Sequence, residues 1–212
     1  MSKNKDGDKN IMTFKVITLG DSFVGKTSII KRFITGKFKP KFINTIGYSV
    51  SSKNIILKNG TEICLNLIDT AGQEKYQALA KTYIKNSDAV LFVFSYDNEE
   101  SFNNIKKWLD NFRENNNNFD SNKSFPAYLV GNKCDLNHVI KQEDIEEIKE
   151  ENNIYGIMET SAKDNININD LFNEIGEMLF NIYGNRKKGQ NVKLAVEFTK
   201  QKKGCNYCLT EV

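Results

Sequence analysis

Gly20-Asp21-Ser22-Phe23-Val24-Gly25-Lys26-Thr27 stands between an apolar run at residues 14–19 and a helix-like stretch at residues 27–33. The octet fits the pattern G-x-x-x-x-G-K-[ST], in which glycines let backbone N–H groups curl around oxyanions at a helix N-terminus. Lys26 would then reach the β- and γ-phosphates of a nucleotide, and the Thr27 hydroxyl would bind Mg²⁺. A Gly-rich turn is the alternative interpretation of the octet alone. The candidate phosphate-binding residues are Asp21, Ser22, Phe23, Val24, Gly25, Lys26, Thr27 and Ser28.

Composition places the chain in a broad class. Its 212 residues are 39% hydrophobic and 27% charged, which suits one α/β domain with a core and a tail. No apolar run approaches the length of a membrane span, and residues 1–10 are polar, so we expect neither a transmembrane helix nor a signal peptide. Four dispersed cysteines form no disulfide framework and favour a reducing, cytosolic location. We expect Cys64 and Cys134 to be small buried side chains.

Apolar runs alternate with helical patterns along the chain. Residues 89–94 and 127–130 are nearly continuous apolar runs, as expected for parallel strands covered on both faces. Lys58-Asn59-Gly60 joins the runs at 54–57 and 61–68, and Asn-Gly between apolar runs indicates an antiparallel hairpin. Two stripes of apolar residues have the helical spacings of three and four. The first consists of Phe102, Ile105, Trp108, Leu109 and Phe112. The second follows Asn167, a candidate helix cap, and consists of Ile168, Leu171, Phe172, Ile175, Leu179 and Ile182.

These patterns predict the fold class and the domain boundaries. We expect a doubly wound α/β domain with a six-stranded, mostly parallel sheet, one antiparallel edge hairpin and helices on both faces. The domain would span residues 13–184, between a flexible N-terminus at residues 1–12 and a basic tail at residues 185–212. Ligand-binding loops would lie at the carboxyl ends of the strands.

Asp69-Thr70-Ala71-Gly72-Gln73-Glu74 directly follows the apolar run that ends at Ile68. Asp69 could hold Mg²⁺, directly or through water, and the N–H of Gly72 could meet a γ-phosphate oxygen. Gln73 could orient a water for in-line attack, because its amide is a donor and an acceptor at once. A plain strand-end turn is the alternative.

Two further polar segments follow buried strands. Asp135, in Asn132-Lys133-Cys134-Asp135, could accept hydrogen bonds from the ring N–H and the exocyclic amino group of guanine, a pair that adenine lacks. Asn132 could brace the loops, and the stem of Lys133 could lie across the base. In Glu159-Thr160-Ser161-Ala162-Lys163, backbone N–H groups, notably that of Ala162, could meet the guanine carbonyl. The candidate residues in this last segment are Ser161, Ala162 and Lys163.

With four motifs in this order, the chain resembles a Ras-superfamily small GTPase from about residue 14 to residue 183. The resemblance implies a G domain that binds GTP or GDP with Mg²⁺ and hydrolyses GTP slowly alone, on the order of 10⁻⁴ to 10⁻³ per second. Thr45 matches the family's switch threonine, which binds Mg²⁺ together with Thr27 and Asp69. Gln73 and Lys26 would be catalytic. Phe38 matches an aromatic that contacts guanine edge-on, with ordinary packing as the alternative.

Within the superfamily the chain is most similar to Rab proteins, which implies a role in vesicle or membrane traffic. The similarity rests on Gly20-Asp21-Ser22, Thr45-Ile46-Gly47, and Ser101-Phe102 upstream of Trp108. The chain departs from the usual Rab pattern at Val50, Ile68, residues 82–85, Phe42 and Phe23.

These departures keep alternative functions open. The chain could belong to another Ras-superfamily branch in signalling, or be a weakly hydrolysing, GTP-bound scaffold. A P-loop metabolite kinase would need an acceptor pocket and a lid, which the motifs do not supply. A slow GTPase also implies an exchange factor, an activating protein and effectors as partners. We expect the G domain to be monomeric.

The tail at residues 185–212 is strongly basic. It holds seven Lys and Arg against two Glu, a net charge of +5, which leaves −2 for residues 1–184 out of the total of +3. Such a tail favours the cytosolic face of an anionic membrane, and lipids on Cys205, Cys208 or both would make attachment durable. A C-a-a-X signal is excluded because Leu209 occupies the cysteine position. A zinc site, inert thiols and a PDZ ligand at residues 210–212 are alternatives. Nucleic-acid binding would rest on the tail alone, and we do not expect it.

Overall fold

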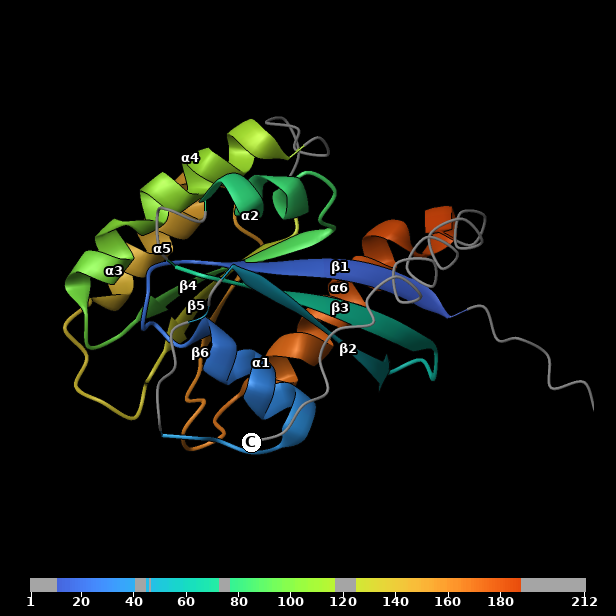
Figure 1. Ribbon diagram of the computed structural model, residues 1–212, viewed down its shortest axis with the longest axis horizontal. Coiled ribbons are helices and arrows are strands. Elements are labelled where there is room, and N and C mark those ends of the chain that lie inside the picture. Colours follow the sequence, from blue (N-terminus) through green and yellow to red (C-terminus); the bar gives the residue numbers. More distant parts are fainter. Residues whose placement is uncertain (1–10, 41–44, 46, 73–76, 117–124, 188–212) are drawn as a thin grey trace, which may run out of the picture.

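The computed structural model describes residues 11–40, 45, 47–72, 77–116 and 125–187. Its centre is a six-stranded sheet in the order β2-β3-β1-β4-β5-β6, with β2 antiparallel to β3 and every other pair parallel (Figure 1). The predicted fold class is therefore confirmed. The strands are β1 (Met12–Leu19), β2 (Tyr48–Ile56), β3 (Glu62–Thr70), β4 (Ala89–Ser95), β5 (Ala127–Asn132) and β6 (Gly156–Glu159).

The predicted hairpin forms between β2 and β3. Its register runs from Tyr48 opposite Thr70 to Ile56 opposite Glu62, and Gly60 closes the turn with a φ of 79°. The strand β2 begins at Tyr48, well before the expected apolar run at 54–57. Sequence pattern missed this part because β2 is an edge strand whose side chains are mostly exposed, so it shows no clean alternation of apolar and polar residues.

Helices cover both faces of the sheet. The helices α1 (Lys26–Thr35) and α6 (Ile168–Lys187) lie on one face, where Phe33 and Phe172 stack with ring centroids 4.0 Å apart (Figure 1). Four helices lie on the other face and share a second core cluster with β4 and β5. They are α2 (Gln77–Ile84), α3 (Glu99–Asn103), α4 (Ile105–Asn115) and α5 (Gln142–Glu151). Every residue of β4 and β5 is buried, as their continuous apolar character predicts.

The stripe from Phe102 to Phe112 is shared by two helices. The helix breaks at Asn104, which ends α3 and begins α4, and all five stripe side chains are buried. The side chain of Asn98 caps α3 by accepting the N–H of Ser101 at 3.1 Å. Asn104 and Trp108, at the start of α4, matter for the functional site because their side chains contact the loop after β1, as described below.

Two expectations about burial are wrong. Ile182 was expected in the apolar stripe of α6, but it is 41% exposed, and Tyr183 contacts the core instead. The spacing of four from Leu179 to Tyr183 continues the buried face, whereas position 182 turns away from it. Cys64 and Cys134 were expected to be buried, but both are only partly buried. Cys64 lies on the more exposed side of β3, where its thiol is 3.8 Å from the Asn66 amide oxygen.

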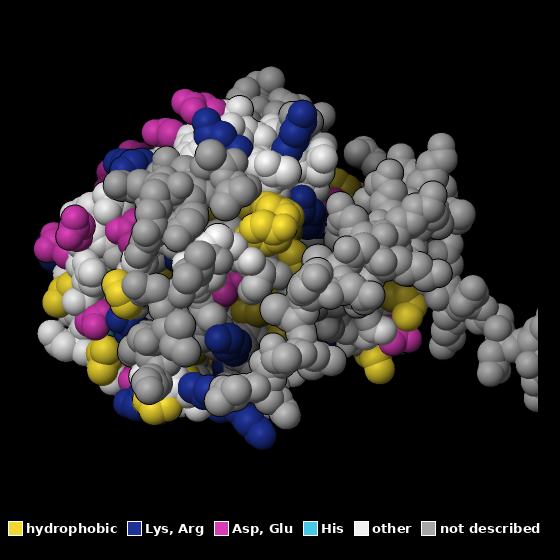
Figure 2. Space-filling view, viewed as in Figure 1, with side chains coloured by type: hydrophobic (Ala, Val, Ile, Leu, Met, Phe, Trp, Pro, Cys, Tyr) yellow, Lys and Arg dark blue, Asp and Glu magenta, His cyan; other side chains and the backbone are white. Residues whose placement is uncertain are grey.

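Charged side chains of both signs are spread over the surface. Figure 2 shows Asp and Glu side chains gathered over the side of the molecule that carries α3 and α4. Within the described part of the chain, no helix combines the length and the apolar character that crossing a bilayer requires. The helix α6 continues to Lys187, slightly past the boundary at 184 that we expected for the domain.

The burial difference along α6 predicts a contrast in stability. Leu179→Ala removes a fully buried side chain and should lower the free energy of unfolding by about 3 kcal/mol. Ile182→Ala is the matched control on the same helix and should change it by no more than about 0.5 kcal/mol. Urea unfolding with saturating GDP measures both values, and equal losses would contradict the exposed position of Ile182 on α6.

Candidate nucleotide-binding site

The four sequence motifs meet at one edge of the sheet. The octet follows the end of β1 at Leu19, Asp69 lies at the end of β3, Asn132 ends β5, and Thr160 follows β6. Since β1, β3, β5 and β6 run parallel, their carboxyl ends lie at the same edge, the usual ligand position in an open α/β sheet. Folding therefore gathers segments that are up to 140 residues apart in the sequence.

The phosphate loop, residues 20–27, depends on its two glycines. Gly20 has a φ of 143°, and a Cβ there would lie 2.1 Å from the Val93 carbonyl oxygen. Gly25 has a φ of 102°, and a Cβ there would lie 2.1 Å from the amide nitrogen of Asn132. Phe23 also has a left-handed backbone, with a φ of 65°, and its ring is 60% exposed. A non-glycine residue in this conformation is strained by roughly 1 kcal/mol.

Lys26 lies within the loop rather than on the surface. It is 5% exposed, and its ammonium donates to the carbonyl oxygens of Gly20 at 2.8 Å and Asp21 at 2.6 Å. Burial lowers the pKa of Lys26 to about 8, and the carboxylates of Asp69 and Asp21 oppose that shift. A buried cation at the start of α1, where backbone N–H groups are also free of helical partners, is suited to an anion.

The three candidate metal ligands come together. The Thr27 hydroxyl donates to Oδ2 of Asp69 at 2.7 Å, and the Thr45 hydroxyl lies 2.7 Å from that of Thr27. Asp69 is 2% exposed, and its other oxygen, Oδ1, has no hydrogen-bond partner among the described residues. Burial raises the pKa of Asp69, against the hydrogen bond from Thr27 and the charge of Lys26. A buried carboxylate oxygen without a partner beside two hydroxyls is a ligand set that fits Mg²⁺.

The side chain of Asn132 connects three segments. Its Nδ2 donates to the Val24 carbonyl at 2.8 Å, and its Oδ1 accepts from the Ala162 N–H at 3.2 Å and from the Thr160 hydroxyl at 3.3 Å. The side chain of Val24 lies in the core, so only its backbone faces the loop. The phosphate loop and the loop after β6 are thus held at a fixed separation.

Asp135 is prepared as an ionised acceptor. Its Oδ1 accepts from the Ser161 hydroxyl at 2.6 Å, and its Oδ2 lies 3.1 Å from the ammonium of Lys163. Burial acts to raise the pKa of Asp135, but the hydrogen bonds from Ser161 and Lys163 outweigh it and hold the pKa below its ordinary value. Lys133 pairs with Asp97 at 3.3 Å, with only its stem available to a base.

The remaining candidate residues differ in how near they lie to the phosphate loop, and some lie outside the described residues. Gly72 lies against the phosphate loop, since a Cβ there would be 2.4 Å from the backbone of Asp21 and Ser22. Ser28 is partly buried in the first turn of α1. Phe38 is partly buried against the core, with the Arg32 guanidinium 5.8 Å above its ring, so both interpretations of Phe38 remain compatible with its position. Gln73, Phe42, Cys205 and Cys208 lie outside the described residues.

One expected nucleotide-binding side chain has another partner. Both oxygens of the Asp21 carboxylate are used: Oδ1 accepts from the Trp108 indole at 2.8 Å and Oδ2 from the Asn104 amide at 2.7 Å. Asp21 can therefore offer a nucleotide its backbone, while its side chain ties the phosphate loop to α4. Sequence reasoning missed Asn104 and used Trp108 only as a member of an apolar helical stripe and as a family marker, since no short motif links residues 87 positions apart.

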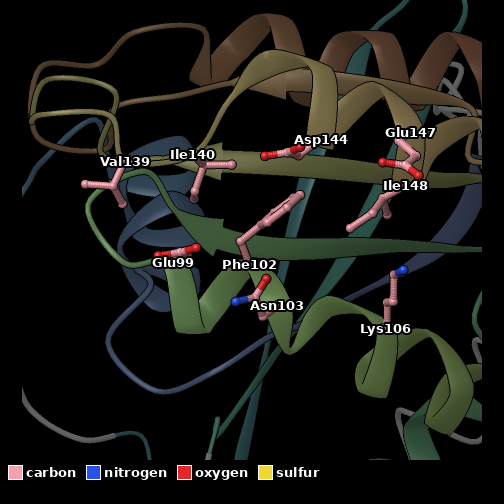
Figure 3. Close-up of a pocket in the computed structure, with 9 residues that line it drawn as sticks. All are labelled: Glu99, Phe102, Asn103, Lys106, Val139, Ile140, Asp144, Glu147 and Ile148. Carbon is pink, nitrogen blue, oxygen red and sulfur yellow. The ribbon is translucent and has the colours of Figure 1, made fainter.

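A separate hollow of about 170 Å³ lies between the α3–α4 pair and α5 (Figure 3). Phe102, Ile140 and Ile148 provide its apolar lining, and carboxylates such as Glu99 and Asp144 lie at its sides. None of the four motifs contributes a lining residue. We therefore assign it no part in nucleotide binding.

Comparison with known proteins agrees with the geometry. The Ras family model matches residues 15–181. The chain is 36% identical over 170 residues to Ras-related protein Rab-10 of Caenorhabditis elegans, covering 79% of this chain and 81% of the relative. It is 36% identical to GTP-binding protein ypt3 of Schizosaccharomyces pombe (82% and 78% covered), and 34% identical to Ras-related protein Rab-8A of Bos taurus (90% and 92% covered). The chain thus belongs to the Ras family of small GTPases, whose domain binds guanine nucleotides and hydrolyses GTP.

Proposed function

We propose that this protein is a Mg²⁺-dependent GTP switch that regulates membrane traffic. The observation that carries the proposal is the buried Oδ1 of Asp69, which has no partner among the described residues and lies beside the Thr27 and Thr45 hydroxyls. Leaving a buried carboxylate oxygen unpaired is costly, and a divalent cation removes that cost. These three residues would hold the ion, which would supply positive charge to the phosphate oxygens.

The protein's own groups would carry the rest of the reaction. The Lys26 ammonium would exchange its bonds to the Gly20 and Asp21 carbonyls for phosphate oxygens and so stabilise developing charge. Gln73 would orient the attacking water with its amide. No step needs a covalent bond to the enzyme, so positioning and electrostatic stabilisation are the main contributions.

Base selection would come from the loops after β5 and β6. Asp135 is ionised and oriented by Ser161, so it can accept the ring N–H and the amino group of guanine. The Ala162 N–H would meet the guanine carbonyl, sharing its hydrogen with Asn132. The stem of Lys133 and the ring of Phe38 would contact the two sides of the base.

Switching would depend on the third phosphate. The Thr45 hydroxyl contacts that of Thr27, one of the proposed metal ligands, and Gly72 contacts the phosphate loop. Both residues can therefore respond to a ligand in that loop. Loss of the γ-phosphate would release them. A slow intrinsic rate would require an activating protein and an exchange factor, and effectors would recognise the GTP-bound form.

The proposed role in traffic rests on the Rab relatives and on the tail. Proteins named Rab-10, Rab-8A and Rab-13 align with most of this chain at 31–38% identity. Each of the seven Lys and Arg side chains within residues 185–212 would contribute about 1 kcal/mol of binding free energy near an anionic cytosolic membrane surface. A lipid on Cys205, Cys208 or both would convert this weak attraction into peripheral attachment.

A GTP-bound scaffold with little hydrolysis is the second candidate. It is favoured by Phe23, whose exposed ring stands in the middle of the phosphate loop. A ring there could obstruct the approach of an activating protein. The two candidates differ in whether bound GTP is hydrolysed at all in a single turnover.

Substitution of Gln73 tests the switch against the scaffold. The wild-type protein should hydrolyse bound GTP at about 10⁻⁴ to 10⁻³ per second with Mg²⁺, and Gln73→Leu should slow this at least about tenfold because the water loses its orienting amide. Single-turnover assays measure both rates. Gln142→Leu, the same change on exposed α5, serves as the control, and EDTA should stop the reaction. Equal rates for Gln73→Leu and wild type would refute the catalytic role of Gln73.

Asp135→Asn tests the choice of base. Asparagine replaces the double acceptor with one donor and one acceptor, which suits the C2 carbonyl of xanthine, so GTP affinity should fall at least about 100-fold while xanthosine triphosphate binds better. Competition binding measures the two affinities. Asp164→Asn removes an exposed carboxylate from the same loop and should leave the preference unchanged. A variant that still prefers GTP would contradict the assignment of Asp135.

The tail cysteines can be tested by intact mass. Protein purified from eukaryotic cells should carry the added mass of one or two lipid groups. Cys205→Ser and Cys208→Ser should each remove a lipid that is attached there, whereas Cys64→Ser, within β3, should retain the full addition. A bare chain mass for the wild type would exclude lipid anchoring under those conditions.

A further inference from the structure

Arg32 links the phosphate-binding helix to the base-binding loop. It lies on α1, and its Nε donates to the Ala162 carbonyl oxygen at 2.7 Å. Its Nη2 donates to the carbonyl oxygen of Lys163, and its Nη1 donates to that of Gly36 at 2.9 Å. One guanidinium thus holds two consecutive peptide groups of the loop after β6 and the C-terminal cap of α1.

The position of Arg32 makes this link direct. Lys26 and Thr27 begin α1, and Arg32 lies six residues after Lys26, about 9 Å further along the helix axis. The helix is a rigid element, so the distance from the phosphate loop to the guanidinium is set by the fold. The guanidinium also lies over the ring of Phe38, the other residue proposed to contact the base.

The loop that Arg32 holds contains the groups that orient Asp135. The Ser161 hydroxyl and the Lys163 ammonium both bind the Asp135 carboxylate. The backbone of Ala162 is held on both sides, because its N–H donates to Asn132 and its own carbonyl oxygen accepts from Arg32. Only arginine offers several donors in a rigid planar fork that can bind adjacent carbonyls, whereas lysine offers a single charged nitrogen.

We propose that Arg32 is a positioning residue that holds the Ser161–Lys163 loop against the base and thereby strengthens the preference for guanine. The proposal rests on the base site described under Proposed function. Without Arg32 the loop would relax outward, and the contacts to the amino group and carbonyl of guanine would weaken. The phosphate contacts of Lys26 would remain, since Lys26 lies at the opposite end of α1 and its ammonium is directed towards the backbone of Gly20 and Asp21, away from the loop that Arg32 holds.

Nucleotide release from the full-length protein with Mg²⁺ tests the proposal. The probes are radiolabelled GDP and IDP, which differ only in the amino group that Asp135 would bind. Arg32→Ala should release GDP about tenfold faster, the size of effect expected from one lost charge-assisted hydrogen bond. It should release IDP only about threefold faster. The preference for GDP over IDP should therefore shrink, which a general loss of stability would not cause.

Two further variants sharpen the test. Arg32→Lys keeps the charge but loses the fork, so it should resemble Arg32→Ala, and it also serves if the alanine variant does not fold. Lys37→Ala removes an exposed cation just beyond α1 and should behave as wild type. GDP release within twofold of wild type, equal acceleration of GDP and IDP, or full rescue by lysine would each overturn the role of Arg32. A wild type with no preference for GDP over IDP would instead refute the proposed base site.

Discussion

The buried amide of Asn132 is the contact on which the rest of the site depends. It is 2% exposed, and it donates to the Val24 carbonyl while accepting from Thr160 and Ala162. An amide is suited to this task because it has a donor and an acceptor a fixed distance apart, whereas a carboxylate could not donate to Val24. This one side chain links the loops after β1, β5 and β6 to one another, and loops that are fixed in this way lose less conformational entropy on binding.

The phosphate loop is fixed from a second direction by Asp21. Its carboxylate accepts from Trp108 and Asn104, so the loop is tied to α4 on one face of the sheet as well as to the base loops. Both donors come from the start of α4, where Asn104 and Trp108 lie about one helical turn apart. Hydrogen bonds to charged groups are stronger than neutral ones, and these two are partly shielded from water. The loop can therefore keep the strained, left-handed backbone of Phe23 between two glycines that adopt positive φ angles without strain.

Much of this arrangement could be predicted from the sequence, and the failures have physical causes. The octet, Asp69, Asn132 and Asp135 were predictable because each motif follows a strand in a parallel sheet, which brings strand ends together. The start of β2 at Tyr48 was not, since an edge strand facing solvent lacks an apolar pattern. Arg32 and the partners of Asp21 were missed because hydrogen bonds across more than 80 residues leave no local signal. Ile182 was misplaced because spacings of three and four both occur on one helix face, and only the packed structure selects between them.

The closeness of Gly72 to the phosphate loop has a mechanical consequence. Even a methyl group at position 72 would overlap the backbone of Asp21 and Ser22, so the backbone at Gly72 and the phosphate loop already lie as near as their atoms permit. Displacement of Gly72 further towards the loop is therefore blocked. The contact is a steric limit: atomic size alone sets how near Gly72 can come to the loop, so this limit does not depend on salt or pH. A ligand in the loop then needs only enough affinity for Gly72 to hold it at this limiting distance.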